Sequence, residues 1–330
     1  MGRWMVLGGT RFLSRAVAQA ALARGHEVVC AARGISGPVP DGAKLVAVDR
    51  DAPGALEALR GERFDAVVDV ATMSLEWVRD ALDALGATAR HWTFVSSINV
   101  YADTATLGQT TDAPLLEPLD AADADTPDDD PNAYGAIKVA SENAVRAATG
   151  DRALVVRGGL MCGPGDVMDR FGYWPARFAR GGRAVVPDSP DQPLQIIDVR
   201  DLAEFIVHSG EEHVVGTFDG SGPQTTLGAV LDEIAGAVGA PDLERVAIPP
   251  DTLLAAGVMP WAGPKSLPLW VPESHRGFVA RDTRPIADAG LRVRPVAETA
   301  RAALEHERAL GLDRERIAGL SADDERALLS

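Results

Sequence analysis

The stretch WMVLGGTRFLSRAV at residues 4–17 decides the fold. Its apolar start is typical of a buried strand, its two glycines of a tight turn, and the residues after them of a helix. The apolar face of that helix is formed by Leu13, Val17, Ala20 and Ala21. Gly25 ends the helix, and residues 27–33 give a second strand. The sequence therefore predicts a βαβ unit whose helix N-terminus can hold a pyrophosphate on free backbone amides.

A tyrosine and a lysine stand four residues apart in the stretch PNAYGAIK, residues 131–138. At this spacing Tyr134 and Lys138 share one face of a helix. A neighbouring ammonium favours the phenolate, so it brings a hydroxyl with an ordinary pKa near ~10 closer to use as a general acid or base. An ordinary exposed helix pair is the alternative, although the chain has only three tyrosines and three lysines.

Two serines end the apolar stretch HWTFVSS at residues 91–97, whose β-branched and aromatic residues predict a buried strand. A serine at the carboxyl end of a strand can donate to a substrate oxygen while a tyrosine handles the proton. Capping of the strand is the alternative for Ser96 or Ser97 taken alone. Together with Tyr134 and Lys138, the pattern favours Ser97 as a catalytic residue.

These features resemble the extended short-chain dehydrogenase/reductase superfamily, which includes NAD(P)-dependent sugar epimerases and dehydratases. Besides the glycine turn, the serine and the tyrosine–lysine pair, the resemblance rests on VVRGGLMCGPG at residues 155–165 and QIIDVRDLA at residues 195–203. It implies an α/β fold, with a Rossmann-type doubly wound parallel sheet and a smaller α/β C-terminal substrate domain.

The resemblance also implies how the chain is divided and which residues act. Residues 1–160 and 195–222 would form the dinucleotide-binding domain, and residues 161–194 and 223–330 the substrate-binding domain. Ser97, Tyr134 and Lys138 would surround a nicotinamide. The implied cofactor contacts are Gly8, Gly9, Thr10, Arg11, Phe12, Leu13, Arg33, Asp49, Arg50, Val70, Ala71, Thr72, Tyr134, Lys138, Gly159 and Leu160.

The first turn departs from the pattern of the superfamily. The usual Gly-x-x-Gly-x-x-Gly would place glycines at positions 8, 11 and 14, but Arg11 and Ser14 occupy two of them. The middle glycine lets the backbone approach the pyrophosphate, and the last one allows close packing of helix and strand. Ser14 is small enough to keep that packing. Arg11 either points outward and contacts a phosphate, which we favour, or obstructs the groove.

The end of the second predicted strand bears on the choice of nicotinamide. NAD-specific sites carry an acidic residue there, whereas an arginine accepts the extra phosphate of NADP. This strand ends in Ala31-Ala32-Arg33-Gly34, without a carboxylate. Arg33, helped by Arg11, could bind that phosphate, so the sequence favours NADP over NAD. The alternative for Arg33 is an ordinary solvated loop arginine.

Composition limits the classes of partner. The 330 residues suffice for one large or two modest domains, and the net charge of -16 argues against nucleic acid or an anionic membrane as a partner. Cys30 and Cys162 are expected to be buried small hydrophobes, and the six histidines lack the spacing of a metal site. With neither a secretory signal nor a spanning segment, we expect a cytoplasmic protein. The expected partner is a small-molecule substrate. The resemblance allows a homodimer.

A long acidic segment separates the serine strand from the tyrosine helix. Residues 112–130 carry eight carboxylates and no lysine or arginine. Such a loop can serve as a lid or a specificity loop, even for a cationic substrate, or simply be a solvated surface loop. Asp130 and Asn132 are candidate caps of the tyrosine helix.

The C-terminal part is expected to complete the substrate site. Helices are predicted from Asp198, over residues 225–238, from Ala297 and from Ser321. The candidate substrate contacts, by the resemblance, are Met73, Asn99, Trp174, Arg177, Trp270 and Arg276. Core packing of the tryptophans and surface pairing of the arginines are the alternatives.

The sequence thus predicts an NAD(P)-dependent oxidoreductase that transfers hydride at a carbonyl or hydroxyl, with Tyr134 as acid or base, Lys138 holding the ribose and lowering the pKa of the tyrosine, and Ser97 orienting the substrate oxygen. The absence of an NAD-type carboxylate favours a reductase or dehydrogenase. An epimerase with a recycled NAD is one alternative. Another is a non-catalytic protein that senses a dinucleotide on the same fold.

Overall fold

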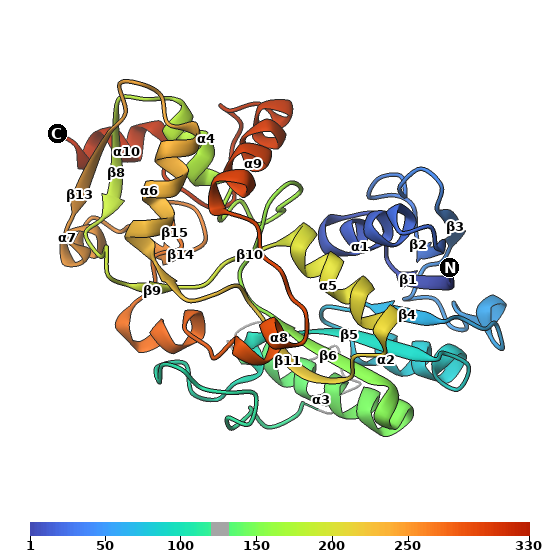
Figure 1. Ribbon diagram of the computed structural model, residues 1–330. Coiled ribbons are helices and arrows are strands. Elements are labelled where there is room, and N and C mark those ends of the chain that lie inside the picture. Colours follow the sequence, from blue (N-terminus) through green and yellow to red (C-terminus); the bar gives the residue numbers. More distant parts are fainter. Residues whose placement is uncertain (120–131) are drawn as a thin grey trace.

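The centre of the molecule is a parallel sheet, seen in a computed structural model that describes residues 1–119 and 132–330 (Figure 1). Its strands are β1 (Arg3–Leu7), β2 (Glu27–Ala32), β3 (Lys44–Ala47), β4 (Ala66–Asp69), β5 (His91–Ser97), β6 (Ala153–Gly158) and β11 (Gly216–Gly220). They lie in the order β11-β6-β5-β4-β1-β2-β3, and every neighbouring pair is parallel. The strand order reverses at β1, so the predicted doubly wound fold is confirmed.

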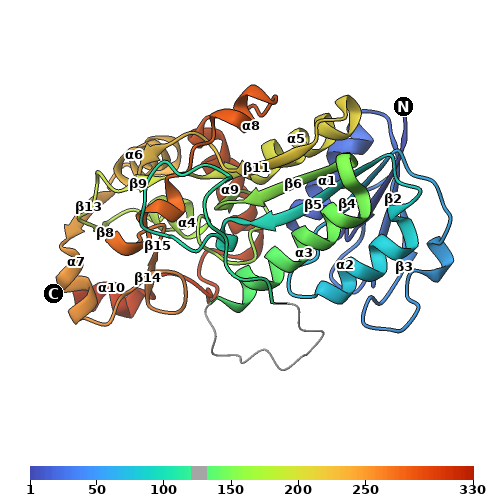
Figure 2. The same ribbon diagram turned by 90° about the horizontal axis from the view of Figure 1, so that it is seen from below.

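Helices cover both faces of the sheet (Figure 2). On one face lie α1 (Phe12–Ala23) and α5 (Val199–Glu212), and on the other lie α2 (Leu75–Ala81) and α3 (Ala133–Thr149). Strand β1 contributes to the hydrophobic cores on both faces of the sheet. Trp4 and Val6 pack with α1 and α5, whereas Met5 and Leu7 pack on the opposite face. Burial on both faces explains why the strands are almost continuously apolar. Short helical turns follow at η1 (Glu57–Leu59), η2 (Leu82–Gly86), η3 (Ile98–Val100) and η4 (Gly150–Arg152).

A second lobe with its own core stands at the carboxyl edge of the sheet (Figure 1). It pairs β8 (Arg183–Pro187) with β13 (Glu244–Ile248) and packs α4 (Tyr173–Ala179), α6 (Leu227–Val238) and α9 (Val296–Leu310) against one another. Its remaining elements and those at the junction are β7 (Met161–Cys162), β9 (Pro193–Leu194), β10 (Ile197–Asp198), β12 (Thr225–Thr226), α7 (Pro250–Ala255), β14 (Met259–Trp261), β15 (Ser266–Pro268), η5 (Glu273–Val279), α8 (Arg284–Asp288) and α10 (Ala322–Leu328). No helix of the described residues is long and apolar enough to cross a bilayer.

Most predicted helix ends agree with the structure, and one cap does not. Asp198 caps α5 by accepting from the amide of Arg200, and Ser321 forms a capping box with Asp324 at α10. Asn132 precedes α3, but its side chain forms no capping bond with that helix, and Asp130 lies outside the described residues. Both cysteines are buried, as predicted, and neither forms a disulfide; Cys162 lies in the short strand β7.

The tyrosine helix α3 approaches the backbone after β5 very closely. A Cβ atom at Gly135 would lie 2.0 Å from the carbonyl oxygen of Asn99 and 2.6 Å from Leu116. Only a glycine therefore lets the first turn of α3 lie against η3. This contact brings the residue before it, Tyr134, to the carboxyl end of β5.

The close approach predicts opposite effects for one substitution made in two helices. Gly135→Ala should lower the free energy of unfolding by about 2 kcal/mol, because the methyl group overlaps backbone. Gly236→Ala in α6, where no atom lies within 4 Å of the new Cβ, should raise it by about 0.5–1 kcal/mol. Urea unfolding of both variants measures the difference, and a shift of the same sign in both would contradict the argument.

Candidate functional site

The chemistry-bearing residues meet at the carboxyl edge of the sheet. Gly8, Val70 and Gly159 follow β1, β4 and β6, and Ser97 is the last residue of β5. Since the strands are parallel, these positions lie side by side facing the second lobe. Helix α3 packs along β5 and adds Tyr134 and Lys138 to this group (Figure 2).

Ser97 and Tyr134 form the first pair of the site. The Ser97 hydroxyl donates to Oδ1 of Asn99 at 2.8 Å and accepts from the Asn99 amide at 3.2 Å. Burial raises the pKa of the Tyr134 hydroxyl, while its hydrogen bond with Ser97 and the charge of Arg170 act to lower that pKa. The net direction is upward, so the tyrosine is protonated at neutral pH. This is the opposite of the direction predicted from the tyrosine–lysine spacing alone.

Lys138 is a buried ammonium beneath the tyrosine. Its Nζ donates to the carbonyl oxygen of Val95 at 2.7 Å and to that of Ala71. The same nitrogen lies 4.8 Å from the ring centroid of Phe94 and 5.9 Å from that of Tyr134. Burial lowers the pKa of Lys138 to about 8, even though Asp69 and Glu142 act to raise it. Lys138 therefore ties the ends of β4 and β5 together, close to the tyrosine.

A cavity of about 180 Å³ lies over the carboxyl ends of β1, β2, β3 and β4. The predicted cofactor residues that line it are Gly8, Thr10, Arg33, Asp49, Arg50, Val70 and Ala71. Gly8 and Gly9 have φ angles of 129° and 102°, and a Cβ at Gly9 would lie 2.4 Å from Sγ of Cys30. The turn can therefore pass close to β2 only without side chains. Helix α1 has no side-chain cap and no acidic residue in its first turn, which suits a phosphate.

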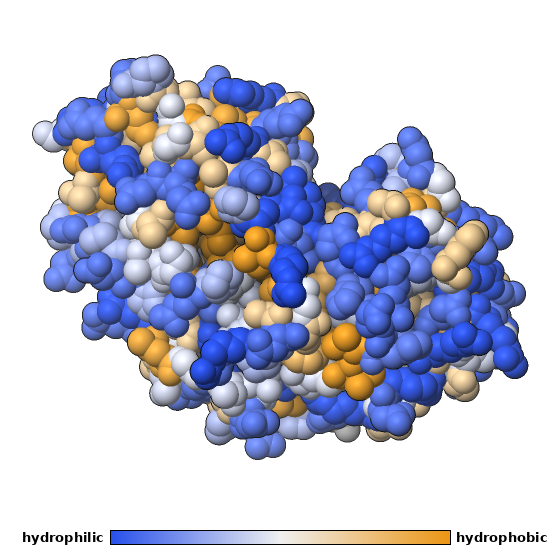
Figure 3. All heavy atoms as spheres, in the orientation of Figure 1, coloured by the Kyte–Doolittle hydropathy of each residue, from blue (hydrophilic) through white to orange (hydrophobic). Residues whose placement is uncertain are grey.

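The two departures from the glycine pattern have different structural roles. Ser14 is buried against Gly8 and donates to the carbonyl of Arg11, so it takes the packing position of the last glycine. Arg11 is exposed and does not line the 180 Å³ cavity, so it does not obstruct it. It lines a larger hollow of about 790 Å³ with Arg15, His306 and Arg314, between the start of α1 and the end of α9. Figure 3 shows a notch in the surface between the lobe that contains the parallel sheet and the second lobe.

Other predicted cofactor residues differ in what they can offer. Most of the Arg50 guanidinium is occupied by contacts within the protein, which leaves little of it for a cofactor. It pairs with buried Asp69 at 3.0 Å, donates to the carbonyl of Trp77 and stacks on the Trp77 ring. Leu13 and Leu160 are buried, and Thr72 is exposed. Gly159 lies against the Ser221 hydroxyl, where a Cβ would be 2.0 Å from Oγ. Phe12 has a φ of 36°, so a non-glycine residue holds the strained position in the turn.

Several substrate contacts implied by the resemblance have structural roles instead. Trp174 and Trp270 are core residues of the second lobe, and buried Arg177 pairs with Glu325 at 2.7 Å. Arg276 forms a surface pair with Glu273, and Met73 is exposed. Their placement argues against substrate contact for the two tryptophans and Arg177. Asn99, by contrast, lines a cavity of about 410 Å³ between η3 and the second lobe.

The structure adds residues that the sequence did not single out. Trp77 and Ser36 complete the 180 Å³ cavity, and Trp261 and Phe278 line the 410 Å³ cavity. Arg170 lies near Tyr134, and its charge acts to lower the pKa of the tyrosine hydroxyl. No local motif marks these positions, because each depends on which segments the fold brings together. Among the described residues, no three His, Cys, Asp or Glu side chains are grouped to hold a metal ion.

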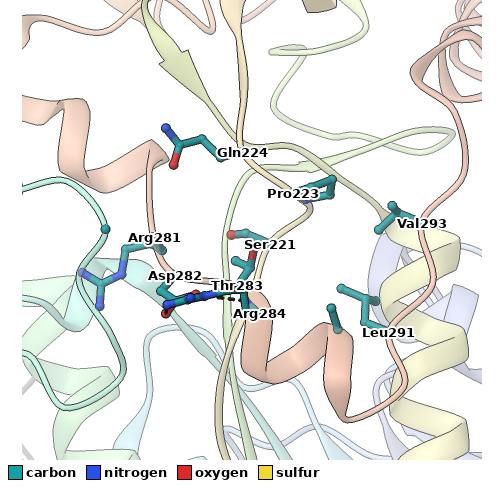
Figure 4. Close-up of a pocket in the computed structure, with 11 residues that line it drawn as sticks. Ser221, Pro223, Gln224, Arg281, Asp282, Thr283, Arg284, Leu291 and Val293 are labelled. Carbon is teal, nitrogen blue, oxygen red and sulfur yellow. Dashed lines mark hydrogen bonds and ion pairs between the residues drawn. The ribbon is translucent and has the colours of Figure 1, made fainter.

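Another depression, of about 470 Å³, lies at the junction of the lobes and does not include the serine–tyrosine pair. Figure 4 shows Pro223, Gln224 and Val293 around it, with Arg281 extending to one side. The Arg281 guanidinium is buried and pairs with Asp219 at 3.1 Å. The depression therefore lies apart from the proton-handling groups.

The buried ammonium predicts a pH-dependent stability. Because burial lowers the pKa of Lys138 from 10.5 to about 8, the unfolded chain binds this proton more tightly between those values. The free energy of unfolding should therefore rise from pH 8 to 10.5 in the wild type relative to Lys138→Met, by up to about 1.4 kcal/mol per pH unit. Urea unfolding across this range tests it, with exposed Lys44→Met expected to follow the wild type. Parallel curves for the wild type and Lys138→Met would disprove it.

Known proteins place this arrangement in a family. Structures of the same fold include a candidate epimerase from Burkholderia cenocepacia J2315, with 22% identity over 93% of this chain and 98% of that one, at a TM-score of 0.68. The UDP-N-acetylglucosamine 4-epimerase from Bacillus cereus has 16% identity over 94% and 100%, at a TM-score of 0.64. The UDP-glucose 4-epimerase of Thermus thermophilus, in complex with NAD, has 17% identity over 93% and 99%, at a TM-score of 0.62.

At these identities the structures show a shared fold only, and no curated protein sequence matches the chain. The family model is more specific. The model of the "NAD dependent epimerase/dehydratase family" matches residues 4–217, which include the glycine turn, Ser97, Tyr134 and Lys138. The chain belongs to the NAD-dependent epimerase/dehydratase family.

Proposed function

We propose that the protein is an NADP-dependent oxidoreductase that reduces a carbonyl, or oxidises the corresponding hydroxyl, of a small molecule. The observation that carries this proposal is the grouping of three residues: Lys138 Nζ lies 5.9 Å from the Tyr134 ring centroid, and Ser97 acts on the pKa of the Tyr134 hydroxyl. A proton donor and an orienting hydroxyl thus converge on one point beside the glycine turn. Such a constellation suits proton transfer to an oxygen more than any other reaction.

The protonation state of the tyrosine favours the reductive direction. Because burial raises the pKa of Tyr134, the hydroxyl carries its proton at neutral pH and can donate it to a substrate carbonyl oxygen. Ser97 donates its single hydroxyl hydrogen to Oδ1 of Asn99 at 2.8 Å in this structure, so that hydrogen would have to turn toward the substrate for Ser97 to donate to the same oxygen. A bound nicotinamide would supply or accept the hydride.

Lys138 has a donor to spare for a bound cofactor. An ammonium has three N–H groups, and two of them are used by the carbonyls of Ala71 and Val95. The third N–H group would be available to a ribose hydroxyl of the cofactor or to the Tyr134 hydroxyl. The two carbonyl bonds would hold the ammonium in place while it does so. This role differs from the one expected from sequence, since Lys138 would position groups more than acidify the phenol.

The dinucleotide would lie along the carboxyl edge of the sheet. Gly8, Gly9 and the first amides of α1 would hold the pyrophosphate, with Arg11 at its outer side. Asp49 and Trp77 line the cavity where the adenine would lie. Arg33 is exposed at the rim of that cavity beside Ser36, where a 2′-phosphate would need a cation.

An epimerase with a tightly held NAD is the second candidate, and the family to which the chain belongs favours it. The two candidates differ in what happens to the cofactor. A reductase releases its oxidised cofactor after each turnover, whereas an epimerase returns the hydride to the same molecule. Mass spectrometry of the protein as purified separates them, because stoichiometric NAD supports the epimerase and exchangeable NADP supports the reductase.

Removing the proton donor should abolish turnover without removing the cofactor. We expect Tyr134→Phe to lower kcat by at least about 100-fold, the range for loss of a general acid, while dinucleotide affinity changes little. Tyr173→Phe, in the core of the second lobe, is the matched control and should keep its activity. Dinucleotide titration and single-turnover assays measure both quantities. Full activity in Tyr134→Phe would refute the proposed chemistry, and dinucleotide binding without any turnover in the wild type would favour a sensor.

The choice of cofactor depends on Arg33. Arg33→Gln should lower the ratio of NADPH to NADH affinity by about tenfold, because a charge-assisted contact to the extra phosphate is lost. Exposed Arg301→Gln, on α9, should leave the ratio unchanged. Calorimetric titration of both cofactors provides the ratio. A wild type that prefers NADH, or a ratio unaffected by Arg33→Gln, would show that the arginine is a solvated loop residue.

A further inference from the structure

The substrate side of the site is a cavity of about 410 Å³ between η3 and the second lobe. Asn99 lines it at one end, next to the Ser97 hydroxyl that it accepts from. Pro260, Trp261, Val271 and Phe278 give it an apolar wall from the second lobe. A substrate whose reacting oxygen lies at Ser97 would therefore place its remaining part against this wall.

Trp261 is held in a strained and well-defined position on that wall. Its φ angle is 71°, a left-handed conformation that is strained for a non-glycine residue, and such strained residues cluster at functional sites. Its ring packs edge-on against Phe278, with centroids 6.1 Å apart. The guanidinium of Arg170 lies 5.1 Å from the Trp261 ring centroid. The tryptophan thus holds a cation next to one of the residues that line the cavity, although Arg170 itself is not among them.

Arg170 differs from the other inward-facing arginines in having no anionic partner. Arg157 pairs with Glu142, Arg177 with Glu325, and Arg281 with Asp219. In the part of the chain that the structure describes, Arg170 forms no ion pair, and its buried Nε has no hydrogen-bond partner. A partly buried guanidinium left this way is destabilising, and an oxyanion from a ligand would relieve that cost.

A neighbouring carboxylate, Asp166, forms no ion pair with Arg170. Asp166 senses the charge of Arg170, but its two oxygens accept from the amides of Met168 at 2.9 Å and Phe171 at 3.3 Å. Arg170 lines neither cavity at the glycine turn, and its contact with Trp261 connects it instead to a residue on the wall of the 410 Å³ cavity. Its charge acts to lower the pKa of the Tyr134 hydroxyl, so its effect reaches the proposed proton donor.

From this arrangement we propose that Arg170 binds an oxyanion of the substrate, a carboxylate or a phosphate, while Trp261 and Phe278 hold a flat apolar group next to it. The proposal deepens the function proposed above and rests on it for the reacting oxygen. It assigns the substrate to the class of small organic anions that carry a carbonyl or hydroxyl. Arg170 is then a residue that selects the substrate and not one that transfers a proton.

Calorimetry on the protein saturated with NADP⁺ tests this, with phenyl phosphate and benzoate as anionic probes and benzyl alcohol as the neutral one. We expect at least one of the anions to bind more tightly than the alcohol. In Arg170→Gln its Kd should rise at least about tenfold, as for loss of one charge-assisted contact. Arg170→Lys should keep most of the affinity, and Arg245→Gln, which breaks a surface pair with Asp232 in the same lobe, should keep all of it.

The two proposals fail in different ways. If the dinucleotide does not bind, the proposed function is wrong, and the probes are then titrated in an Arg11→Gln background so that anions at the glycine turn do not contribute. If the dinucleotide binds but neither anion does, or if Arg170→Gln binds the anions as the wild type does, only the role of Arg170 is overturned. A phosphate that binds where benzoate does not would identify the oxyanion as phosphate, and the reverse as carboxylate.

Discussion

A carboxylate that is completely shielded from solvent, Glu142, sets the geometry on which the rest of the site depends. It accepts two bonds from Arg157, at 3.0 and 2.9 Å, and one from the Ser96 hydroxyl at 2.6 Å. These contacts join α3 to β5 and β6. Because Glu142 stands one turn after Lys138 on the same helix face, this ion pair fixes how α3 is rotated against the sheet. Removing one partner would leave an uncompensated buried charge, so the rotation is strongly defined.

The same pair is the start of a polar network that reaches the second lobe. Arg157 donates to the Tyr101 hydroxyl at 2.9 Å, and that hydroxyl donates to Asp219 at 2.6 Å. Asp219 then pairs with Arg281, whose guanidinium lies 3.4 Å from the Tyr101 ring centroid. A chain of satisfied buried groups gives one preferred arrangement of its members. The wall that carries Trp261 is therefore held at a defined place relative to Ser97 and Tyr134.

How far the sequence leads depends on whether a feature is local. The glycine turn, the serine at the end of β5 and the tyrosine–lysine spacing each lie within one or two elements, so their pattern predicts both the fold and these residues. Arg50 shows the limit, because its pairing with Asp69 joins the segment after β3 to the end of β4, and these two strands are not neighbours in the sheet. Residue type alone does not tell a core tryptophan such as Trp174 from a pocket tryptophan such as Trp261. The raised pKa of Tyr134 was equally hidden, since burial outweighs the spacing that suggested a lowered one.

Charge distribution connects the site to the composition of the whole chain. The protein has a net charge of -16, yet the carboxyl edge of its sheet gathers Lys138 and Arg170, neither of which is neutralised by a carboxylate bonded to it among the described residues. At physiological salt the field of surface carboxylates decays over about 8 Å, so an anion that has entered the cleft is governed by these nearby cations. Outside the cleft the same anion is repelled, and the repulsion increases as salt is removed. The proposed binding of a dinucleotide and an anionic substrate is thus compatible with an acidic protein, because the attraction is local and poorly screened, whereas the repulsion is distant and screened.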